Sequence, residues 1–266
     1  MLLHEKEHRL EQILAQYGRV AIAFSGGADS SLLAKKAIEV LGTENVLLLT
    51  AGSCLLKQRE IDHAAGWLSR HGYGEQVRHR FVELQPLFWD EFVRNPPDRC
   101  YLCKLRVYRC FVEFSTQEGI TALVDGTNDD DKHTARPGLR ALLELGIGTP
   151  LAEAELSKEE VRSLSRDIGL DTWDRPSASC LATRVPDGLQ ITPERIALID
   201  KLELQLESMG FQGCRIRLDR QSSDKIYIQV REKDVVAVAS AANRSALVHF
   251  FNDSGVKKIF VDLHGR

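Results

Sequence analysis

The sequence of 266 residues lacks any apolar run long enough to cross a bilayer, so a membrane-spanning protein is not expected. It has no internal repeats and no low-complexity segments. Its N-terminal stretch MLLHEKEHRLEQIL is charged and helical in pattern, unlike a signal peptide, so a cytoplasmic location is expected. The net charge of −3 gives no bulk attraction to nucleic acid or anionic membranes, and neither is expected as a partner.

Cysteine is scarce as well. Six cysteines in a chain of this size are too few for a disulfide scaffold. In a reducing compartment they are expected to be thiols, metal ligands or reactive groups. They lie at positions 54, 100, 103, 110, 180 and 214.

The first two-thirds of the chain alternates strand and helix patterns. Short apolar runs rich in β-formers are followed by helical stretches, which is typical of a parallel sheet covered by helices. Strands are expected at 19–24, 45–51, 77–84 and 120–126, and helices at 29–42, 59–72, 101–118 and 157–169. The predicted fold class is therefore α/β, with a nucleotide-binding type of domain over residues 1–175.

The pattern changes after this domain. Residues 171–190 are loop-like, and 176–190 are expected to form a linker that carries Cys180. The elements expected beyond it are a capped helix over 192–210, a hairpin of 215–219 with 225–230, a helix near 232–252 and a strand at 257–263. They predict a small α+β domain over residues 191–266.

The stretch Ser25-Gly-Gly-Ala-Asp-Ser30 joins the first predicted strand to its helix. Two glycines let the backbone approach an anion, and a helix N-terminus presents free N–H groups that suit phosphate. The loop is not a Walker A motif, because no Gly-Lys-Ser/Thr follows. A plain glycine turn with Asp29 as helix cap is the alternative, and the full hexapeptide between strand and helix makes it the less expected one.

A second, acidic loop, Gly126-Thr-Asn-Asp-Asp-Asp131, follows the strand expected at 120–126. Ligands of open α/β sheets bind beyond the carboxyl ends of the strands, so this loop is expected to face the same crevice as Ser25–Ser30. Gly126 and Asn128 are candidates for nucleotide contacts, and Asp131 is a candidate for binding Mg²⁺ or positioning substrate. For two of the three aspartates, a solvated acidic turn is the expected role.

Cys100 and Cys103, in the segment DRCYLCK, have a spacing that suits a shared metal. A structural zinc site usually takes two such pairs, and the chain has only one, with His133 as a further possible ligand. A redox disulfide and an iron–sulfur site stay open at this point. Cys54, Cys110 and Cys214 stand alone and are expected to be ordinary buried thiols.

Cys180 lies in RPSASCLATR, an irregular segment with flanking arginines. Reactive residues are often held on such loops, and a nearby arginine would favour the thiolate. A loop cysteine without a role is the alternative. Three thiolates, Cys100, Cys103 and Cys180, are enough to hold a [4Fe–4S] cluster with one iron open to bind and deliver a sulfide.

The hexapeptide SGGADS resembles the SGGxDS motif of the PP-loop ATP pyrophosphatases, which cleave ATP between its α and β phosphates and adenylate an acid or amide-like oxygen. The resemblance implies that pyrophosphate or its Mg²⁺ is held by Ser25, Gly26, Gly27, Asp29 and Ser30. An adenylated carboxylate can then be attacked by a nucleophile, with AMP as the leaving group.

The combination of SGGADS, DRCYLCK, VDGTNDDD with ARPG at 135–138, and WDRPSASCLATRVPDG at 173–188 resembles the LarE family. These ATP-dependent sulfur transferases build the nickel-pincer nucleotide of lactate racemase. The resemblance implies a pyridinium dicarboxylate mononucleotide as substrate, with ATP and Mg²⁺. It runs from about residue 10 to the end and is looser after 220.

The family has two kinds of sulfur supply. In one, a single cysteine gives up its own sulfur and becomes dehydroalanine, and Cys180 matches it. In the other, three cysteines bind a [4Fe–4S] cluster that carries the extra sulfide from a donor. Because Cys100, Cys103 and Cys180 fill all three positions, the cluster version is expected.

The resemblance also implies substrate-binding residues in the C-terminal domain. Arg215 and Arg217 fit the family's phosphate-binding arginines, and Glu203 and Asp234 lie where the family places acidic residues near the substrate. Gln229 stands where members often carry glutamate. The alternative for these residues is ordinary surface charge. A homo-oligomer is common in the family and is expected here.

Three other functions compete with this one. A tRNA thiolase of the same superfamily should show basic patches, and the chain is slightly acidic. A synthetase of the kind that makes NAD or GMP uses ammonia and would leave the segment 171–190 unexplained. A non-catalytic ATP-binding redox sensor would use Cys100 and Cys103 as a disulfide and release no pyrophosphate.

Overall fold

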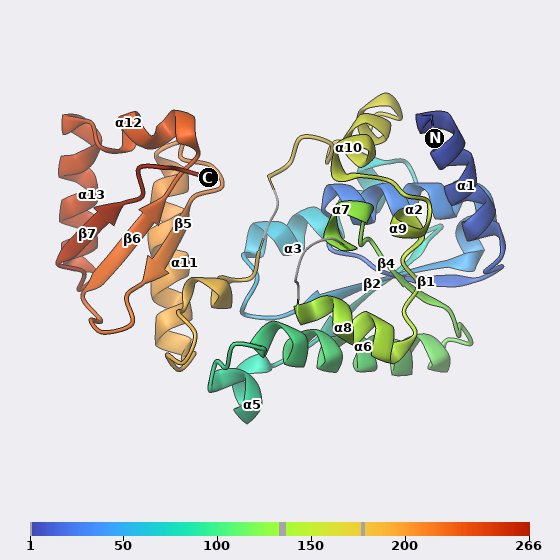
Figure 1. Ribbon diagram of the computed structural model, residues 1–266, viewed down its shortest axis with the longest axis horizontal. Helices are drawn as coiled ribbons and strands as arrows, with labels where there is room; N and C mark the ends of the chain where they lie inside the picture. Colours follow the sequence, from blue (N-terminus) through green and yellow to red (C-terminus); the bar gives the residue numbers. More distant parts are fainter. Residues whose placement is uncertain (1, 133–136, 177–178) are drawn as a thin grey trace. The chain divides into compact units, whose positions relative to one another are not determined.

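The computed structural model describes residues 2–132, 137–176 and 179–266. The chain divides into two compact units (Figure 1). The first unit contains Met1–Ser53, Gln58–Leu84 and Cys100–Arg175, and the second contains Cys54–Lys57, Gln85–Arg99 and Pro176–Arg266. The second unit therefore includes residues 176–190 and two short segments from the N-terminal half of the chain.

The first unit is built on a four-stranded parallel sheet in the order β3-β2-β1-β4. Its strands are β1 (Val20–Ala23), β2 (Val46–Gly52), β3 (Arg78–Glu83) and β4 (Leu123–Asp125). Ala23, the last residue of β1, pairs with Asp125, the last residue of β4. The two strands therefore end side by side, and the loops that follow them start at the same edge of the sheet.

Helices cover both faces of this sheet (Figure 1). One face carries α1 (Leu3–Ala15), α2 (Ala28–Leu41), α9 (Pro150–Glu153) and α10 (Lys158–Asp167), and the other carries α6 (Arg99–Gln117) and α8 (Pro137–Leu145). Alternate residues of β1 feed two cores: Ile22 packs with Leu33 of α2, and Ala21 packs with Phe111 of α6. Burial on both faces explains the continuous apolar runs of these strands. The remaining short helices of the unit are η1 (Thr43–Asn45), α3 (Gln58–Ala65), α4 (Trp67–Arg70) and α7 (Asp129–Lys132).

The second unit has a three-stranded sheet in the order β5-β6-β7. The hairpin of β5 (Arg215–Leu218) and β6 (Lys225–Gln229) is antiparallel, and β7 (Lys258–Val261) lies parallel to β6. The helix α11 (Pro193–Ser208) packs against β5. The other helices are η2 (Pro86–Phe88), α5 (Asp90–Val93), η3 (Leu181–Arg184), η4 (Glu232–Asp234), α12 (Val235–Val238) and α13 (Ala241–Asp253).

The predicted α/β class with a smaller α+β part is confirmed. The predicted capping box is present, since Ser157 Oγ accepts from the Glu160 N–H and Glu160 Oε2 accepts from the Ser157 N–H.

Two helix predictions are wrong in part. The helix predicted over 59–72 breaks at Gly66, a residue that costs about 1 kcal/mol in a helix interior. The helix predicted near 232–252 breaks at Ser240, whose extended backbone begins α13. Among the described helices, none is both long and apolar enough to cross a membrane.

Candidate active site

The loop Ser25–Ser30 leaves the end of β1 and enters α2. Gly26 has φ +71°, and a Cβ there would lie 3.1 Å from Ala64, so both its conformation and its close packing require glycine. Gly27 is the N-cap residue, which makes the alternative of Asp29 as helix cap wrong. Because the first N–H groups of a helix have no partner within it, the start of α2 is suited to an anion.

The two serines of the loop face each other. Ser25 Oγ lies 3.1 Å from Ser30 Oγ and accepts a hydrogen bond from the Gly27 N–H at 3.3 Å. Ser30 Oγ in turn lies 3.3 Å from the Ser25 backbone nitrogen. These bonds hold the loop in a closed turn with two hydroxyls at the start of α2, and such a turn can accommodate phosphate oxygens.

The loop after β4 lies directly against this turn. A Cβ on Gly126 would come 3.0 Å from the backbone nitrogen of Ser30, so only glycine allows this approach. The Asn128 side chain, which is almost fully buried, donates a hydrogen bond of 2.8 Å to Asp29 Oδ1. The structure thus brings together Asp29, Ser30, Gly126 and Asn128, four of the residues predicted from the sequence.

Asp29 carries an unfavourable negative charge. Burial raises the pKa of its carboxyl group, the hydrogen bond from Asn128 opposes that shift, and the charge of Asp131 raises the pKa further. A partly buried carboxylate with a second carboxylate close by is suited to share a divalent cation with it, which would relieve their repulsion. The other two aspartates have structural contacts: Asp130 accepts from the Lys158 N–H at 2.8 Å, and Asp129 lies 3.3 Å from Lys132 Nζ.

Asp125, at the end of β4, is a residue of this site that the sequence did not indicate. Its carboxylate is buried and accepts hydrogen bonds from the Thr127 N–H at 2.8 Å, the Thr127 hydroxyl and the Tyr108 hydroxyl. Lys104 Nζ lies 3.4 Å from Asp125 Oδ2. The available sequence signal was a polar residue at the carboxyl end of a buried strand, in VDG.

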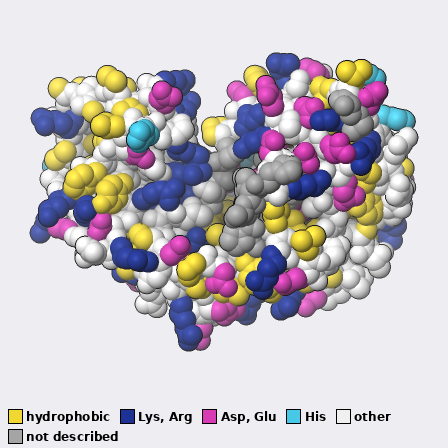
Figure 2. All heavy atoms as spheres, viewed as in Figure 1, with side chains coloured by type: hydrophobic (Ala, Val, Ile, Leu, Met, Phe, Trp, Pro, Cys, Tyr) yellow, Lys and Arg dark blue, Asp and Glu magenta, His cyan; other side chains and the backbone are white. Residues whose placement is uncertain are grey.

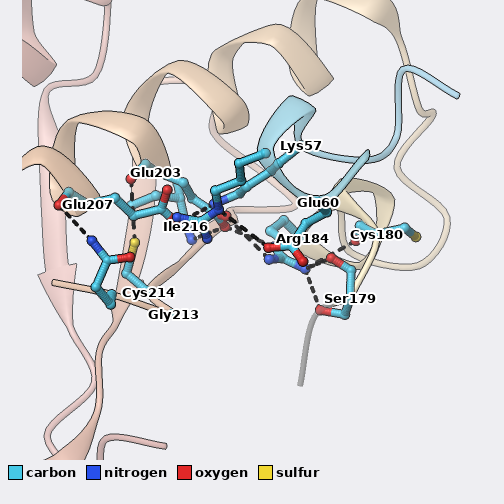
Figure 3. Close-up of polar contacts among 12 residues, drawn as sticks. Lys57, Glu60, Ser179, Cys180, Arg184, Glu203, Glu207, Gly213, Cys214 and Ile216 are labelled. Carbon is cyan, nitrogen blue, oxygen red and sulfur yellow. Dashed lines mark hydrogen bonds and ion pairs between the residues drawn. The ribbon is translucent and has the colours of Figure 1, made fainter. Parts of the chain in front are cut away.

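The second unit has a buried ionic network around Glu203 of α11 (Figure 3). The Glu203 side chain is fully buried and accepts hydrogen bonds from Arg184 Nε at 2.8 Å and from the Ile216 N–H at 2.9 Å. Lys57 Nζ lies 2.7 Å from Glu203 and 2.6 Å from Glu207. Burial alone would raise the pKa of Glu203, but the hydrogen bond and charge of Arg184, with Lys57, outweigh it and hold the pKa below its usual value.

Arg215 and Arg217 lie on β5 beside this network. Burial and the nearby charges of Arg266, Arg184 and Arg217 lower the pKa of Arg215 to about 10. Its Nε is buried and has no hydrogen-bond partner among the described atoms. Figure 2 shows Lys and Arg side chains gathered over the part of the second unit that holds β5 and the C-terminus. A region with this excess of positive charge is suited to an anionic ligand.

The remaining predicted residues of this unit have local partners. Arg217 Nε donates to Gln229 Oε1 at 2.6 Å, so the glutamine at this position acts as a neutral acceptor. Asp234 lies in η4, and its Oδ2 accepts from Arg231 Nε at 2.8 Å. The structure therefore groups Arg215, Arg217 and Glu203 with Arg184, and it gives Asp234 an ion pair of its own.

Arg184 also binds the segment that carries Cys180. Its Nη1 donates to the Ser179 and Cys180 carbonyl oxygens at 2.9 and 3.1 Å. The Cys180 side chain points away from this guanidinium (Figure 3). Arg184 therefore fixes the backbone at Cys180. Ser177 and Ala178 of this segment lie outside the described residues.

Cys100 and Cys103 occupy the start of α6 in the first unit, one turn apart, whereas Cys180 belongs to the second unit. Cys100 is exposed, Cys103 and Cys180 are partly exposed, and none of the six cysteines forms a disulfide. The prediction of burial is correct for Cys214 but wrong for Cys54, which is exposed, and for Cys110, which is partly exposed. In the described parts of the chain, no group of three or more His, Cys, Asp or Glu side chains is placed to hold a metal ion. His133, Ala135 and Arg136 lie outside those parts.

The parallel sheet, the SGGADS turn at the end of β1 and the glycine contact from the loop after β4 define a PP-loop ATP pyrophosphatase. Consistent with this class, the chain is 27% identical to the NH(3)-dependent NAD(+) synthetase of Chlorobaculum tepidum, over 62% of this chain and 59% of the relative. No protein-family model matches the chain.

Two relatives match almost the whole chain. One is an uncharacterized protein of Synechocystis, 32% identical over 99% of this chain and 96% of the relative. The other is pyridinium-3,5-bisthiocarboxylic acid mononucleotide synthase of Lactiplantibacillus plantarum, 31% identical over 99% of this chain and 92% of the relative. The chain belongs to the family of this synthase, the LarE family.

Proposed function

We propose that the protein is an ATP-dependent sulfur transferase. It adenylates the carboxylates of a pyridinium-3,5-dicarboxylate mononucleotide and replaces the activated oxygen with sulfur, giving thiocarboxylates for the nickel-pincer cofactor of lactate racemase. The observation that carries the proposal is the 31% identity, over both units, to a synthase of the bisthiocarboxylic acid mononucleotide. A PP-loop alone would support ATP use and leave the acceptor open.

In the proposed reaction, a substrate carboxylate oxygen attacks the α-phosphorus of ATP, and pyrophosphate leaves. A sulfur nucleophile then adds to the acyl carbon, and the C–O bond to AMP breaks to give the thiocarboxylate. Ser25, Gly26, Gly27 and Ser30 hold the phosphates through N–H groups and hydroxyls, which is supported by the closed turn that these residues form at the start of α2. Asp29 and Asp131 bind Mg²⁺, which is supported by the raised pKa of Asp29.

The phosphate of the mononucleotide binds Arg215 and Arg217 of the second unit. The charges of Arg184 and Arg217 help to lower the pKa of Arg215, so a bound anion would be stabilised by several cations at once. Glu203 positions Arg184 and the start of β5, because it accepts from both Arg184 and the Ile216 N–H. The family resemblance alone supports a position of Asp234 near the substrate.

For sulfur supply we favour a [4Fe–4S] cluster bound by Cys100, Cys103 and Cys180. Thiolate is the donor that such clusters take, the three thiols are at least partly exposed, and the first two lie one turn apart on α6. A cluster with three cysteine ligands leaves one iron able to hold a sulfide. A sulfide donor, a homo-oligomeric state and a cytoplasmic location are further predictions of the same proposal.

The test of the activity supplies ATP, Mg²⁺, sulfide and the dicarboxylate mononucleotide to anaerobically purified protein. AMP, pyrophosphate and thiocarboxylate should form in equal amounts. Asp29→Asn is the matched negative control, and Glu5→Gln, on the exposed start of α1, is the neutral one. A protein that binds ATP but releases no pyrophosphate would support the redox-sensor alternative and contradict the proposal.

The sulfur source is tested on the same material. Iron and acid-labile sulfide should be present after reconstitution of the wild type and should be lost in Cys100→Ala, whereas Cys110→Ala should retain them. If wild type binds no iron and Cys180 instead loses the elements of H₂S in the intact-mass spectrum after one turnover, the sacrificial route replaces the cluster.

A further inference from the structure

Asn95 is a fully buried residue of the second unit, just after α5, and its backbone has a left-handed conformation with φ +56°. Residues other than glycine adopt this conformation at a cost, and asparagine is one of the few that tolerate it. In the described parts of the chain, Glu155 is the only other non-glycine residue with a positive φ. Such a conformation persists where the surrounding contacts hold it, so the contacts of Asn95 indicate its role.

These contacts are with the segment that follows Cys180. Asn95 Nδ2 donates hydrogen bonds to the carbonyl oxygens of Pro186 at 2.7 Å and Leu189 at 2.8 Å. The backbone carbonyl of Asn95 accepts a third bond from the Gly188 N–H at 2.7 Å. One buried side chain and its backbone therefore fix residues 186–189, although Asn95 and Pro186 are 91 positions apart in the chain.

Arg99 extends this link to the immediate neighbourhood of Cys180. Its side chain is buried, and its Nη1 donates to Asn95 Oδ1 and to the Ala182 carbonyl oxygen at 3.1 Å. Hydrogen bonds from a charged donor are stronger than those between neutral groups, and a buried guanidinium with two acceptors is held in one place. Arg99 is also the first residue of α6, directly before Cys100. One chain of hydrogen bonds thus joins the residue before Cys100 to a residue two positions after Cys180.

The backbone at Cys180 has further anchors within the same unit. The Leu181 N–H donates to the Leu55 carbonyl oxygen at 2.8 Å, and Arg184 Nη1 donates to the Cys180 carbonyl oxygen at 3.1 Å. Together with the link through Asn95, these bonds fix the chain closely around the thiol. Such precision matters for group transfer, because a misplacement of about 1 Å can cost about a hundredfold in rate.

We propose that Asn95 and Arg99 are positioning residues for sulfur transfer, which act by fixing the segment that carries Cys180. The proposal rests on the proposed function for the reaction itself, and it applies whether Cys180 binds a cluster or gives up its own sulfur. Neither residue is assigned a contact with ATP, so adenylation should not depend on them. When the segment is loosened, water should attack the acyl carbon in place of sulfur. The C–O bond to AMP then breaks, and the carboxylate, AMP and a proton are released.

The experiment compares thiocarboxylate with pyrophosphate in wild type and variants. Asn95→Gly removes the amide but keeps the left-handed backbone accessible, and Arg99→Met removes the guanidinium at similar length. In both, the ratio of thiocarboxylate to pyrophosphate should fall about tenfold, while the rate of pyrophosphate release stays within about twofold. Arg99→Lys, which keeps a cation able to donate to both oxygens, should recover much of the ratio. Phe251→Leu, in the core of the same unit on α13, controls for lost stability and should keep the wild-type ratio.

A second measurement reads the position of Cys180 without the reaction. In protein freed of iron with a chelator, alkylation by iodoacetamide is followed by peptide mass spectrometry. The rate at Cys180 should rise about threefold or more in Asn95→Gly and Arg99→Met, because a loosened segment is more accessible, and the rate at Cys110 should not change. Arg99→Met carries the test if Asn95→Gly does not fold.

A wild-type ratio in both variants would overturn the proposal, whatever the alkylation rates. An equal fall in thiocarboxylate and pyrophosphate would also overturn it, and so would a lowered ratio with an unchanged rate at Cys180. These results leave the proposed function standing if wild type forms thiocarboxylate. If wild type forms none but Cys180 alone reacts faster in the variants, the control of Cys180 by Asn95 and Arg99 stands and the proposed function fails.

Discussion

Removal of the Glu203 carboxylate should be among the most damaging single changes to the second unit. The side chain is fully buried, and the two cations that contact it, Lys57 and Arg184, are only 8% and 5% exposed. Glu203→Ala would remove the carboxylate that pairs with Arg184, would leave Lys57 with Glu207 alone, and would leave the Ile216 N–H without its acceptor. Breaking a buried ion pair by removing one partner costs about 3–5 kcal/mol, so we expect a loss of that size in the free energy of unfolding.

Urea denaturation followed by far-UV circular dichroism measures this loss. Glu194→Gln is the control, since Glu194 lies on the same helix but is exposed, and its change should stay below about 1 kcal/mol. The pair Glu203→Leu and Arg184→Met should be less destabilising together than the sum of the single changes, with a coupling of about 0.5–3 kcal/mol. Equal effects of Glu203→Ala and Glu194→Gln would refute the argument.

The same network predicts a pH dependence. Because Arg184 and Lys57 hold the pKa of Glu203 below its usual value of 4.5, its ionised form is favoured in the folded state. The stability it contributes is present above about pH 4.5 and is lost as the pH falls through the lower, folded pKa. Glu203→Gln should flatten this part of the stability profile, whereas Glu232→Gln, at an exposed position in η4 of the same unit, should not.

Three further predictions concern the first unit. Asp29→Asn should raise the melting temperature in the absence of Mg²⁺, because it removes the repulsion with Asp131, and should weaken Mg–ATP binding at least tenfold; a lower melting temperature would contradict the repulsion. Burial lowers the pKa of His79 to about 4, so stability should fall as the pH drops from 6.5 through 4, and an NMR titration of His79 that gives a pKa near 6.5 would contradict this. Ser157→Ala should cost about 1 kcal/mol in urea denaturation, because it removes the acceptor for the Glu160 N–H, and Ser163→Ala on the same helix is the control.

The sequence determined the α/β class and the phosphate-binding turn by itself. Buried parallel strands are apolar on both faces, so they stand out as short runs, and SGGADS between a strand and a helix is a local signal that needs no distant contact. The capping box of α10 was predictable for the same reason, since Ser157 and Glu160 interact within one turn. Helix ends were less certain: Gly66 and Ser240 break predicted helices because local backbone preference competes with helical periodicity.

Only the tertiary structure decided which polar residues act together. Two contacts of the site require β1 and β4 to be neighbours, although about a hundred residues separate these strands in the chain. They are the close approach of Gly126 to Ser30 and the hydrogen bond from Asn128 to Asp29. The proximity of Lys104 and Asp125 could not be predicted from the sequence either, because no spacing rule links a helix residue to the end of a strand. Glu203 was expected near substrate from a family pattern, and its full burial with Arg184 and Lys57 came from packing. Short segments of the sequence determine local features such as turns and caps, whereas the pairing of buried charges depends on contacts that only the folded chain creates.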